Sequence, residues 1–192
     1  MKPRVYILSR APIFGLAKTR LAVDIGKVHT HRLYKSMIKK VIRRTQDPRW
    51  EVIISGTPLK SLGKVIEWRG MKQVLQARGT LSNKLYEIFL KQGPIVVIGT
   101  DCPQLNQKDI ASAFKALKSY DAVFGPAEDG GFWLIGMNAP VKKDIFNNVR
   151  WSNKFTLNDI LSNIGGSVFH LRQLIDIDDI SSLKTVKKTS AW

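Results

Sequence analysis

The sequence predicts an α/β fold with a mainly parallel β-sheet and helices on both of its faces. Two observations predict it: short β-branched apolar runs recur along the chain, and amphipathic helical stretches separate them. The chain has 192 residues, of which 44% are hydrophobic, and this is enough to bury one core. We therefore expect a single domain over residues 1–192.

The elements follow from these patterns in chain order. Runs rich in Val, Ile and aromatic residues predict strands over residues 4–9, 51–55, 72–76, 94–99, 122–125, 132–136 and 167–171. Apolar residues at helical spacing predict helices over residues 30–46, 59–66, 82–91, 107–119, 154–163 and 178–186. The segment after the first strand, with Pro12 and Gly15 as its turn signals, is expected to be a loop.

The charge of the chain is strongly positive and unevenly distributed. Lys and Arg number 31 against 15 Asp and Glu, which gives a formal net charge of +16. Residues 1–96 hold 20 basic and 5 acidic residues, whereas residues 97–192 hold 11 and 10. This division favours anion binding by the first half and metal or acid–base chemistry by the second.

The composition also excludes several classes of protein. Cys102 is the only cysteine, so an internal disulfide or a cysteine-based zinc site cannot form, and the three histidines lack metal-site spacing. The longest apolar runs have four residues, far fewer than the roughly 20 of a membrane span. No signal-peptide pattern is present. We expect a cytoplasmic protein without a membrane span, and its oligomeric state stays open.

A candidate phosphate site follows the first strand. Gly15 and Thr19 lie there among three cations, Arg10, Lys18 and Arg20. Backbone N–H groups and side-chain charges of such a loop can surround a polyphosphate. A solvated basic loop is the plain alternative, but ligands in parallel sheets bind at the carboxyl ends of strands, which favours binding.

A candidate metal ligand follows the strand predicted over residues 94–99. Gly99 and Thr100 lead directly into Asp101. A carboxylate at the end of a buried strand is costly to desolvate without a cation, so Asp101 is a candidate ligand for Mg²⁺ or Mn²⁺. A helix-capping role for this segment is the alternative. Cys102 is expected to be a small buried residue rather than a nucleophile.

Two further segments supply acceptor-side candidates. Glu128 and Asp129 precede Gly130 and Gly131 between two strands, which combines an acidic pair with backbone that a ligand can approach closely. An Asp-Gly turn is the alternative, and the two interpretations are compatible.

Nearer the C-terminus, Asp176 is a candidate second metal contact, whereas Asp178 is also a candidate helix cap. Trp151, followed by Ser152, could stack on a ligand ring, but a core position is favoured for it.

Together these segments resemble a known family. The motifs that carry the resemblance are Ala17-Lys18-Thr19-Arg20-Leu21, Gly99-Thr100-Asp101-Cys102-Pro103-Gln104-Leu105, Gly125-Pro126-Ala127-Glu128-Asp129-Gly130-Gly131-Phe132, Trp151-Ser152 and residues 176–178. Their order resembles that of a small bacterial GT-A-like glycosyltransferase family related to the 2-phospho-L-lactate guanylyltransferases. The resemblance covers residues 5–183.

The resemblance implies a Rossmann-like GT-A fold, that of nucleotide-diphospho-sugar transferases, which binds a nucleotide with Mg²⁺ or Mn²⁺. It implies donor and phosphate contacts by Arg10, Gly15, Lys18, Thr19, Arg20, Lys84, Gly99 and Thr100. It places the metal on Asp101, with Asp176 or Asp178 on the other side. Glu128 and Asp129 would face the acceptor, one of them as general base, beside Gly130, Gly131, Trp151 and Ser152.

The chain departs from the family pattern at three places. Relatives commonly have Leu-Gly-Glu-Arg where this chain has Leu81-Ser82-Asn83-Lys84, so an acid is absent and a bidentate arginine is replaced by lysine. Asn153-Lys154 replaces the more usual Thr-Glu, and Asp101 lacks the second acid of an Asp-x-Asp motif.

Three hypotheses follow for the function. The first is a metal-dependent glycosyltransferase that uses an NDP-sugar and a small-molecule acceptor. The second is a nucleotidyltransferase that joins an NTP to a phosphorylated acceptor and releases pyrophosphate, since a triphosphate suits the cations at residues 18–20. The third is a nucleotide- or nucleic-acid-binding protein without turnover; against nucleic acid, the chain has no helix-turn-helix, zinc-finger or RNP signature.

Overall fold

A computed structural model of the chain describes residues 1–188. Within them, a seven-stranded sheet has the order β3-β2-β1-β4-β6-β5-β7. The strands are β1 (Arg4–Arg10), β2 (Glu51–Thr57), β3 (Lys72–Leu75), β4 (Gly93–Ile98), β5 (Ala122–Pro126), β6 (Phe132–Ala139) and β7 (Val168–His170). Only β6 runs antiparallel to its neighbours among the described strands. The mainly parallel sheet of the prediction is confirmed.

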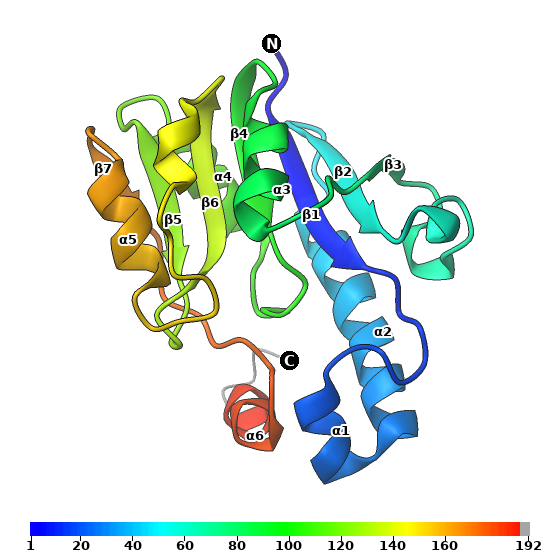
Figure 1. Ribbon diagram of the computed structural model, residues 1–192. Helices are drawn as coiled ribbons and strands as arrows, with labels where there is room; N and C mark the ends of the chain where they lie inside the picture. The colour runs from blue at the N-terminus through cyan, green and yellow to red at the C-terminus, as the bar shows by residue number, and fades with distance from the viewer. Residues whose placement is uncertain (189–192) are drawn as a thin grey trace.

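The helices cover both faces of this sheet (Figure 1). They are α1 (Thr19–Ile25), α2 (Lys27–Thr45), α3 (Leu81–Phe89), α4 (Gln107–Ala116), α5 (Thr156–Asn163) and α6 (Ile180–Lys188), with short 3₁₀ turns at η1 (Leu59–Ser61), η2 (Ile66–Trp68) and η3 (Lys143–Phe146). None of the helices within residues 1–188 is long and apolar enough to cross a membrane.

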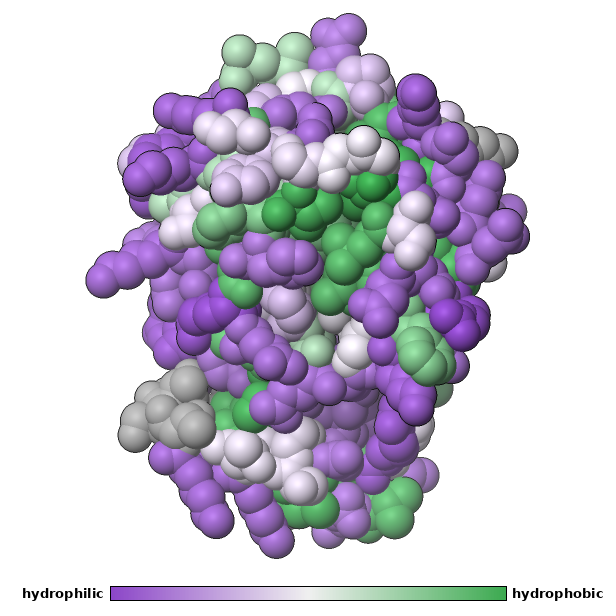
Figure 2. Space-filling view, turned by 90° about the vertical axis from the view of Figure 1, so that its left-hand side faces the viewer, coloured by the Kyte–Doolittle hydropathy of each residue, from purple (hydrophilic) through white to green (hydrophobic). Residues whose placement is uncertain are grey.

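Strand alternation divides the core into two layers. Successive side chains of a strand point to opposite faces, so Val5 and Ile7 of β1 pack with α2 and α4, whereas Tyr6 packs with α3 and α5. A third apolar cluster lies beyond the sheet, where Leu21 of α1, Met37 of α2 and residues of α6 meet. Seen from the side of β7 and α5, hydrophilic residues cover most of the surface around a central hydrophobic area and smaller hydrophobic spots elsewhere (Figure 2).

The helix predicted over residues 59–66 is wrong. The segment forms η1 and the start of η2, with Gly63 between them. Gly63 has a φ of +74°, a left-handed conformation that interrupts any helix through this point.

A helix that was not predicted, α1, begins within the expected loop. Lys18, its N-cap residue, makes no side-chain capping bond, so the usual sequence signal for a helix start is missing. In contrast, α3 and α4 begin with capping boxes at Thr80 and Asn106.

The topology places the candidate site. The carboxyl ends of β1 and β4 point toward the half of the molecule that contains α1 and α6 (Figure 1). In this half, Ile177 donates a backbone hydrogen bond to the Asp101 carbonyl at 3.0 Å. The C-terminal segment is thereby fixed against the end of β4.

Candidate active site

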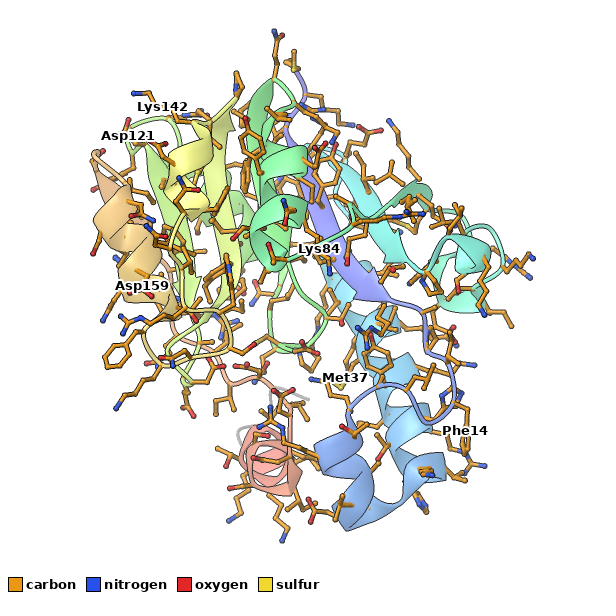
Figure 3. The ribbon with its side chains drawn as sticks, viewed as in Figure 1. Phe14, Met37, Lys84, Asp121, Lys142 and Asp159 are labelled. Carbon is orange, nitrogen blue, oxygen red and sulfur yellow. The ribbon has the colours of Figure 1, made fainter. Side chains whose placement is uncertain are left out.

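The carboxyl ends of β1, β2, β3 and β4 surround a cavity of about 430 Å³, which we call the basic cavity. Four cationic side chains line it: Arg10, Lys18, Arg20 and Lys84. Arg10 ends β1, the next two flank the start of α1, and Lys84 belongs to the first turn of α3. Figure 3 shows Lys84 near the centre of the molecule, beside β1. Three separate segments of the chain therefore bring four positive charges to one cavity.

Sequence reasoning named most of this lining but not all of it. Thr19 and Thr100 lie in the lining, while Gly15 lies in the exposed turn before it. Tyr34, Thr57 and Gln76 also line the cavity and were not predicted. Thr57 is the last residue of β2 and Gln76 follows β3, so their position at strand ends was the signal that could have found them.

Lys18 lies between two carboxylates rather than free in the cavity. Its Nζ is 2.6 Å from Asp101 Oδ1, and it also contacts Asp178 Oδ1. The Lys18 side chain is only 9% exposed, whereas those of Asp101 and Asp178 are 47% and 40% exposed. The exposed Arg20 approaches Asp178 as well, with Nη2 3.6 Å from Asp178 Oδ2.

This environment keeps Lys18 charged. Burial alone would lower its pKa, but attraction and hydrogen bonding to Asp101 and Asp178 raise the pKa above its ordinary value. Lys18 also has a left-handed backbone, with φ 54° and ψ 49°. This conformation is uncommon for a residue with a side chain and is typical of functional sites.

Asp101 and Asp178 are the carboxylates that could hold a divalent cation. Among residues 1–188, no three His, Cys, Asp or Glu side chains lie close enough together to form a complete metal site. Two carboxylates, Asp101 and Asp178, nevertheless converge on one positive group. Carboxylate oxygens are the ligands that Mg²⁺ and Mn²⁺ prefer, and Mg²⁺ commonly uses one or two of them together with water and phosphate. These two residues therefore fit such a cation.

A second cavity of about 280 Å³ adjoins the first, and we call it the acidic cavity. Its charged lining consists of the carboxylates Asp101, Asp129 and Asp176; no Lys, Arg or His contributes to it within residues 1–188. The remaining wall is largely apolar and includes Phe132, Trp133 and Trp151. Asp101 lines both cavities and joins them.

The Gly130-Gly131 turn holds Asp129 at this cavity. The N–H of Gly131 donates to Asp129 Oδ1 at 2.8 Å. Gly130 has a φ of +84°, and a Cβ there would lie 2.1 Å from the Lys154 carbonyl oxygen. Glu128 and Asp129 are both exposed, and both line a neighbouring groove with Arg20 and Lys154; Asp129 also lines the acidic cavity, whereas Glu128 does not.

Ser82 and Asn83, the two residues before Lys84 that depart from the family pattern, have structural roles. Ser82 accepts a hydrogen bond from Trp151 Nε1 at 2.8 Å and donates one to the Phe146 carbonyl at 3.0 Å. Asn83 completes the capping box with Thr80. Trp151 packs with its ring edge toward Phe132 and lines the acidic cavity beside Ser152 and Gly131. It is therefore both half-buried and part of the cavity wall.

Asp176 is electrostatically unfavourable in its charged form. Burial, together with repulsion by Asp129 and then by Asp178 and Asp101, raises its pKa to about 6.

Cys102, next to Asp101, is buried, and burial raises the pKa of its thiol well above the ordinary value. A thiolate nucleophile is therefore disfavoured there.

Replacing Asp176 by asparagine is expected to raise the free energy of unfolding by about 1–2 kcal/mol at about pH 7.5, in metal-free buffer. The folded-state pKa is about 6 against an ordinary 3.8. As the pH rises, the unfolded chain therefore loses this proton before the folded protein does. Between about pH 4 and pH 6 the charged carboxylate lowers the free energy of unfolding progressively. The gain of the variant should therefore vanish below about pH 4. Urea unfolding of the wild type and the variant, at about pH 7.5 and again below about pH 4, measures this difference in stability.

Asp24→Asn, on the exposed side of α1, is the matched control. It should change the free energy of unfolding by less than about 0.5 kcal/mol at either pH. An equal gain for Asp176→Asn at both pH values would contradict the electrostatic origin of the effect.

Comparisons with known proteins place this geometry in context. A model of the family described as "Uncharacterized protein conserved in bacteria (DUF2064)" matches residues 38–153. No curated protein matches the chain in sequence.

Solved structures share the fold. A candidate nucleotide-diphospho-sugar transferase from Desulfovibrio desulfuricans G20 is 21% identical with a TM-score of 0.92, over 98% of this chain and 87% of that one. CMP:2-keto-3-deoxy-manno-octonic acid synthetase complexed with CTP is 14% identical with a TM-score of 0.61, over 100% and 99%. The manganese complex of Rv0371c from Mycobacterium tuberculosis H37Rv is 12% identical with a TM-score of 0.58, over 98% and 100%. The chain thus has the nucleotide-diphospho-sugar-transferase fold.

Proposed function

This chain belongs to the DUF2064 family of bacterial proteins, and we propose that it is a metal-dependent glycosyltransferase that uses an NDP-sugar. The observation that carries the proposal is the contrast between the two adjoining cavities. One is lined by four cations, and the other has carboxylates as its only charged side chains among residues 1–188. A donor with phosphates and an acceptor without them suit this pair of cavities.

The donor diphosphate is proposed to bind in the basic cavity. Arg10, Arg20 and Lys84 supply positive charge from three segments, and arginine can bind phosphate through two parallel hydrogen bonds. Their charges would stabilise the negative charge that develops on the leaving phosphate. The relationship in fold to a synthetase that binds CTP supports this use of the cavity.

The metal is proposed to be Mg²⁺ or Mn²⁺, held by Asp101 and Asp178. A divalent cation there would neutralise the leaving phosphate as a Lewis acid. The fold shared with a manganese complex supports this choice. Asp176 lines the acidic cavity together with Asp101 and would keep the acceptor side negative.

The acceptor is proposed to be a neutral or cationic compound with a hydroxyl group. Inside the acidic cavity a phosphorylated acceptor would meet Asp129 and Asp176 and no cation of the described lining; the cations Arg20 and Lys154 lie with these carboxylates only in the neighbouring groove. The faces of Trp151 and Phe132 suit the apolar side of a sugar ring. Asp129 and Asp176 are the candidate general bases for the acceptor hydroxyl, and the raised pKa of Asp176 brings it near the operating range of a base.

Nucleotidyl transfer is the second candidate. The CTP-binding relative and the number of cations in the basic cavity favour it, because a triphosphate carries more charge than an NDP-sugar. In this reaction pyrophosphate leaves, and the acceptor would itself carry a phosphate. Lys154 and Arg20, in the groove beside Glu128, are the nearest cations that could bind that phosphate.

The two reactions are separated by their products. The protein is incubated with Mg²⁺ and either a pool of NDP-sugars plus neutral polyols, or a pool of NTPs plus sugar phosphates. Glycosyl transfer is expected to release NDP only in the first mixture, and omission of Mg²⁺ is the control. Release of pyrophosphate in the second mixture alone would replace the proposal by nucleotidyl transfer, and release of neither product would contradict both.

A further inference from the structure

We infer that Lys18 is a built-in cation that occupies the metal position between Asp101 and Asp178 and exchanges with the divalent cation when the site is loaded. The inference rests on the proposed use of a divalent metal, and it assigns to Lys18 a role distinct from simple phosphate binding. Lys18 would act as a positioning residue that links metal binding to phosphate binding.

The first argument is the place of the ammonium group. It contacts the Oδ1 atoms of both carboxylates, and Asp178 lies 160 residues from it in the sequence. Two carboxylates at the mouth of one cavity repel each other unless a cation lies between them. In this structure Lys18 supplies that cation, and a metal ion that binds both carboxylates must take the same position.

The second argument is access. The Lys18 side chain is buried, but both carboxylates remain about half exposed. Lys18 contacts each carboxylate through its Oδ1 atom, and Asp178 Oδ2 lies 3.6 Å from Nη2 of the exposed Arg20. An ion that arrives from solvent can therefore reach carboxylate oxygens before Lys18 has left, which makes a stepwise exchange feasible.

The third argument is where Lys18 can go. It lines the same cavity as Arg10 and Lys84, so a displaced ammonium remains among the groups proposed to bind phosphate. Lysine is a flexible side chain with a compact charge and adapts readily to a new partner. Repulsion by the bound metal would thus move Lys18 toward the donor phosphates. Metal binding and phosphate binding would therefore favour each other.

The test measures Mn²⁺ binding without any nucleotide. Free Mn²⁺ is followed by electron paramagnetic resonance during titration of the wild-type protein and of Lys18→Met. Since the competing charge is removed, Lys18→Met is expected to bind Mn²⁺ roughly tenfold more tightly or better. Lys84→Met removes the same charge from the same cavity without a contact to either carboxylate, and its Mn²⁺ affinity should change by less than about threefold.

Unchanged, weaker or absent Mn²⁺ binding by Lys18→Met would overturn the inference. Failure of the proposed glycosyl transfer is a separate result, because it is measured as NDP release and leaves the Mn²⁺ affinities unaffected.

A second measurement uses the wild-type protein and covers the case in which the variant does not fold. Lysine amines are methylated reductively, and the extent of reaction at each site is read by mass spectrometry. Lys18 is expected to react slowly without metal and several-fold faster with saturating Mg²⁺, while exposed Lys39 on α2 serves as the internal reference. Equal reactivity of Lys18 with and without Mg²⁺ would count against the exchange.

Discussion

Replacement of Asp101 by asparagine is expected to lower the rate of metal-dependent transfer by at least about 100-fold, since a bound metal contributes several kcal/mol to stabilising the transition state. Asp101 is the charged residue that lines both cavities, and it is one of the two carboxylates that converge on Lys18. Asparagine keeps the shape of the side chain but removes the charge that holds a cation. The rate is measured as NDP release at saturating Mg²⁺.

Measurements of unfolding and of ligand binding distinguish the loss of a metal ligand in Asp101→Asn from a general loss of structure. Asp101→Asn should keep a cooperative urea transition, because Lys18 retains Asp178 as a partner. It should lose most of the Mg²⁺-dependent thermal stabilisation by NDP-sugar, which for the wild type amounts to about 2.7 kcal/mol at 100 times the dissociation constant. Asp24→Asn should behave as wild type in both measurements. A rate for Asp101→Asn within about threefold of wild type would exclude Asp101 as a metal ligand.

The sheet could be predicted closely from sequence because strands are coded locally. Contiguous Val and Ile in β1 and β4 indicate burial on both faces, and the structure buries Val5 and Ile7 on one face and Tyr6 on the other. The predicted strand over residues 94–99 differs from β4 by one residue at each end. Positions at the carboxyl ends of strands also indicated where the site lies.

The prediction was weaker where the backbone departs from regular conformations. Gly63 interrupts the apolar periodicity of residues 59–66, and the periodicity alone gave no sign that this glycine would adopt a positive φ. Lys18 begins α1 with a left-handed backbone and without a capping bond, so nothing in its local sequence marked a helix start.

Contacts between distant residues could not be predicted at all. The sequence marked Lys18 as a phosphate contact, but its contacts to Asp101 and Asp178 join segments 83 and 160 residues apart. Ser82 stands where relatives commonly have glycine, and nothing in the sequence indicated that it accepts a hydrogen bond from Trp151. In both cases the identity of the residue indicated a polar role, and only the fold determined the partner.

Replacement of Gly130 by alanine is expected to lower the free energy of unfolding by about 2–4 kcal/mol, because two separate costs add. The first is the left-handed conformation, since φ is +84° and a side chain disfavours it. The second is steric: the new Cβ would lie 2.1 Å from the Lys154 carbonyl oxygen, which is backbone and cannot move alone. The Gly130 carbonyl also accepts the Leu157 N–H at 3.0 Å, so a shift of the turn disturbs the start of α5.

Replacement of Gly130 by alanine is also expected to weaken acceptor binding. Asp129 is held by the N–H of Gly131, and a displaced turn would move this carboxylate in the acidic cavity. Activity should therefore fall, with a rise in the KM of the acceptor, at temperatures where the variant is still folded. Gly165→Ala is the matched control, because no atom lies within 4 Å of the added Cβ and its φ is not positive. Urea unfolding of the two variants compares them directly, and equal stabilities would show that the Gly130 turn relaxes without cost.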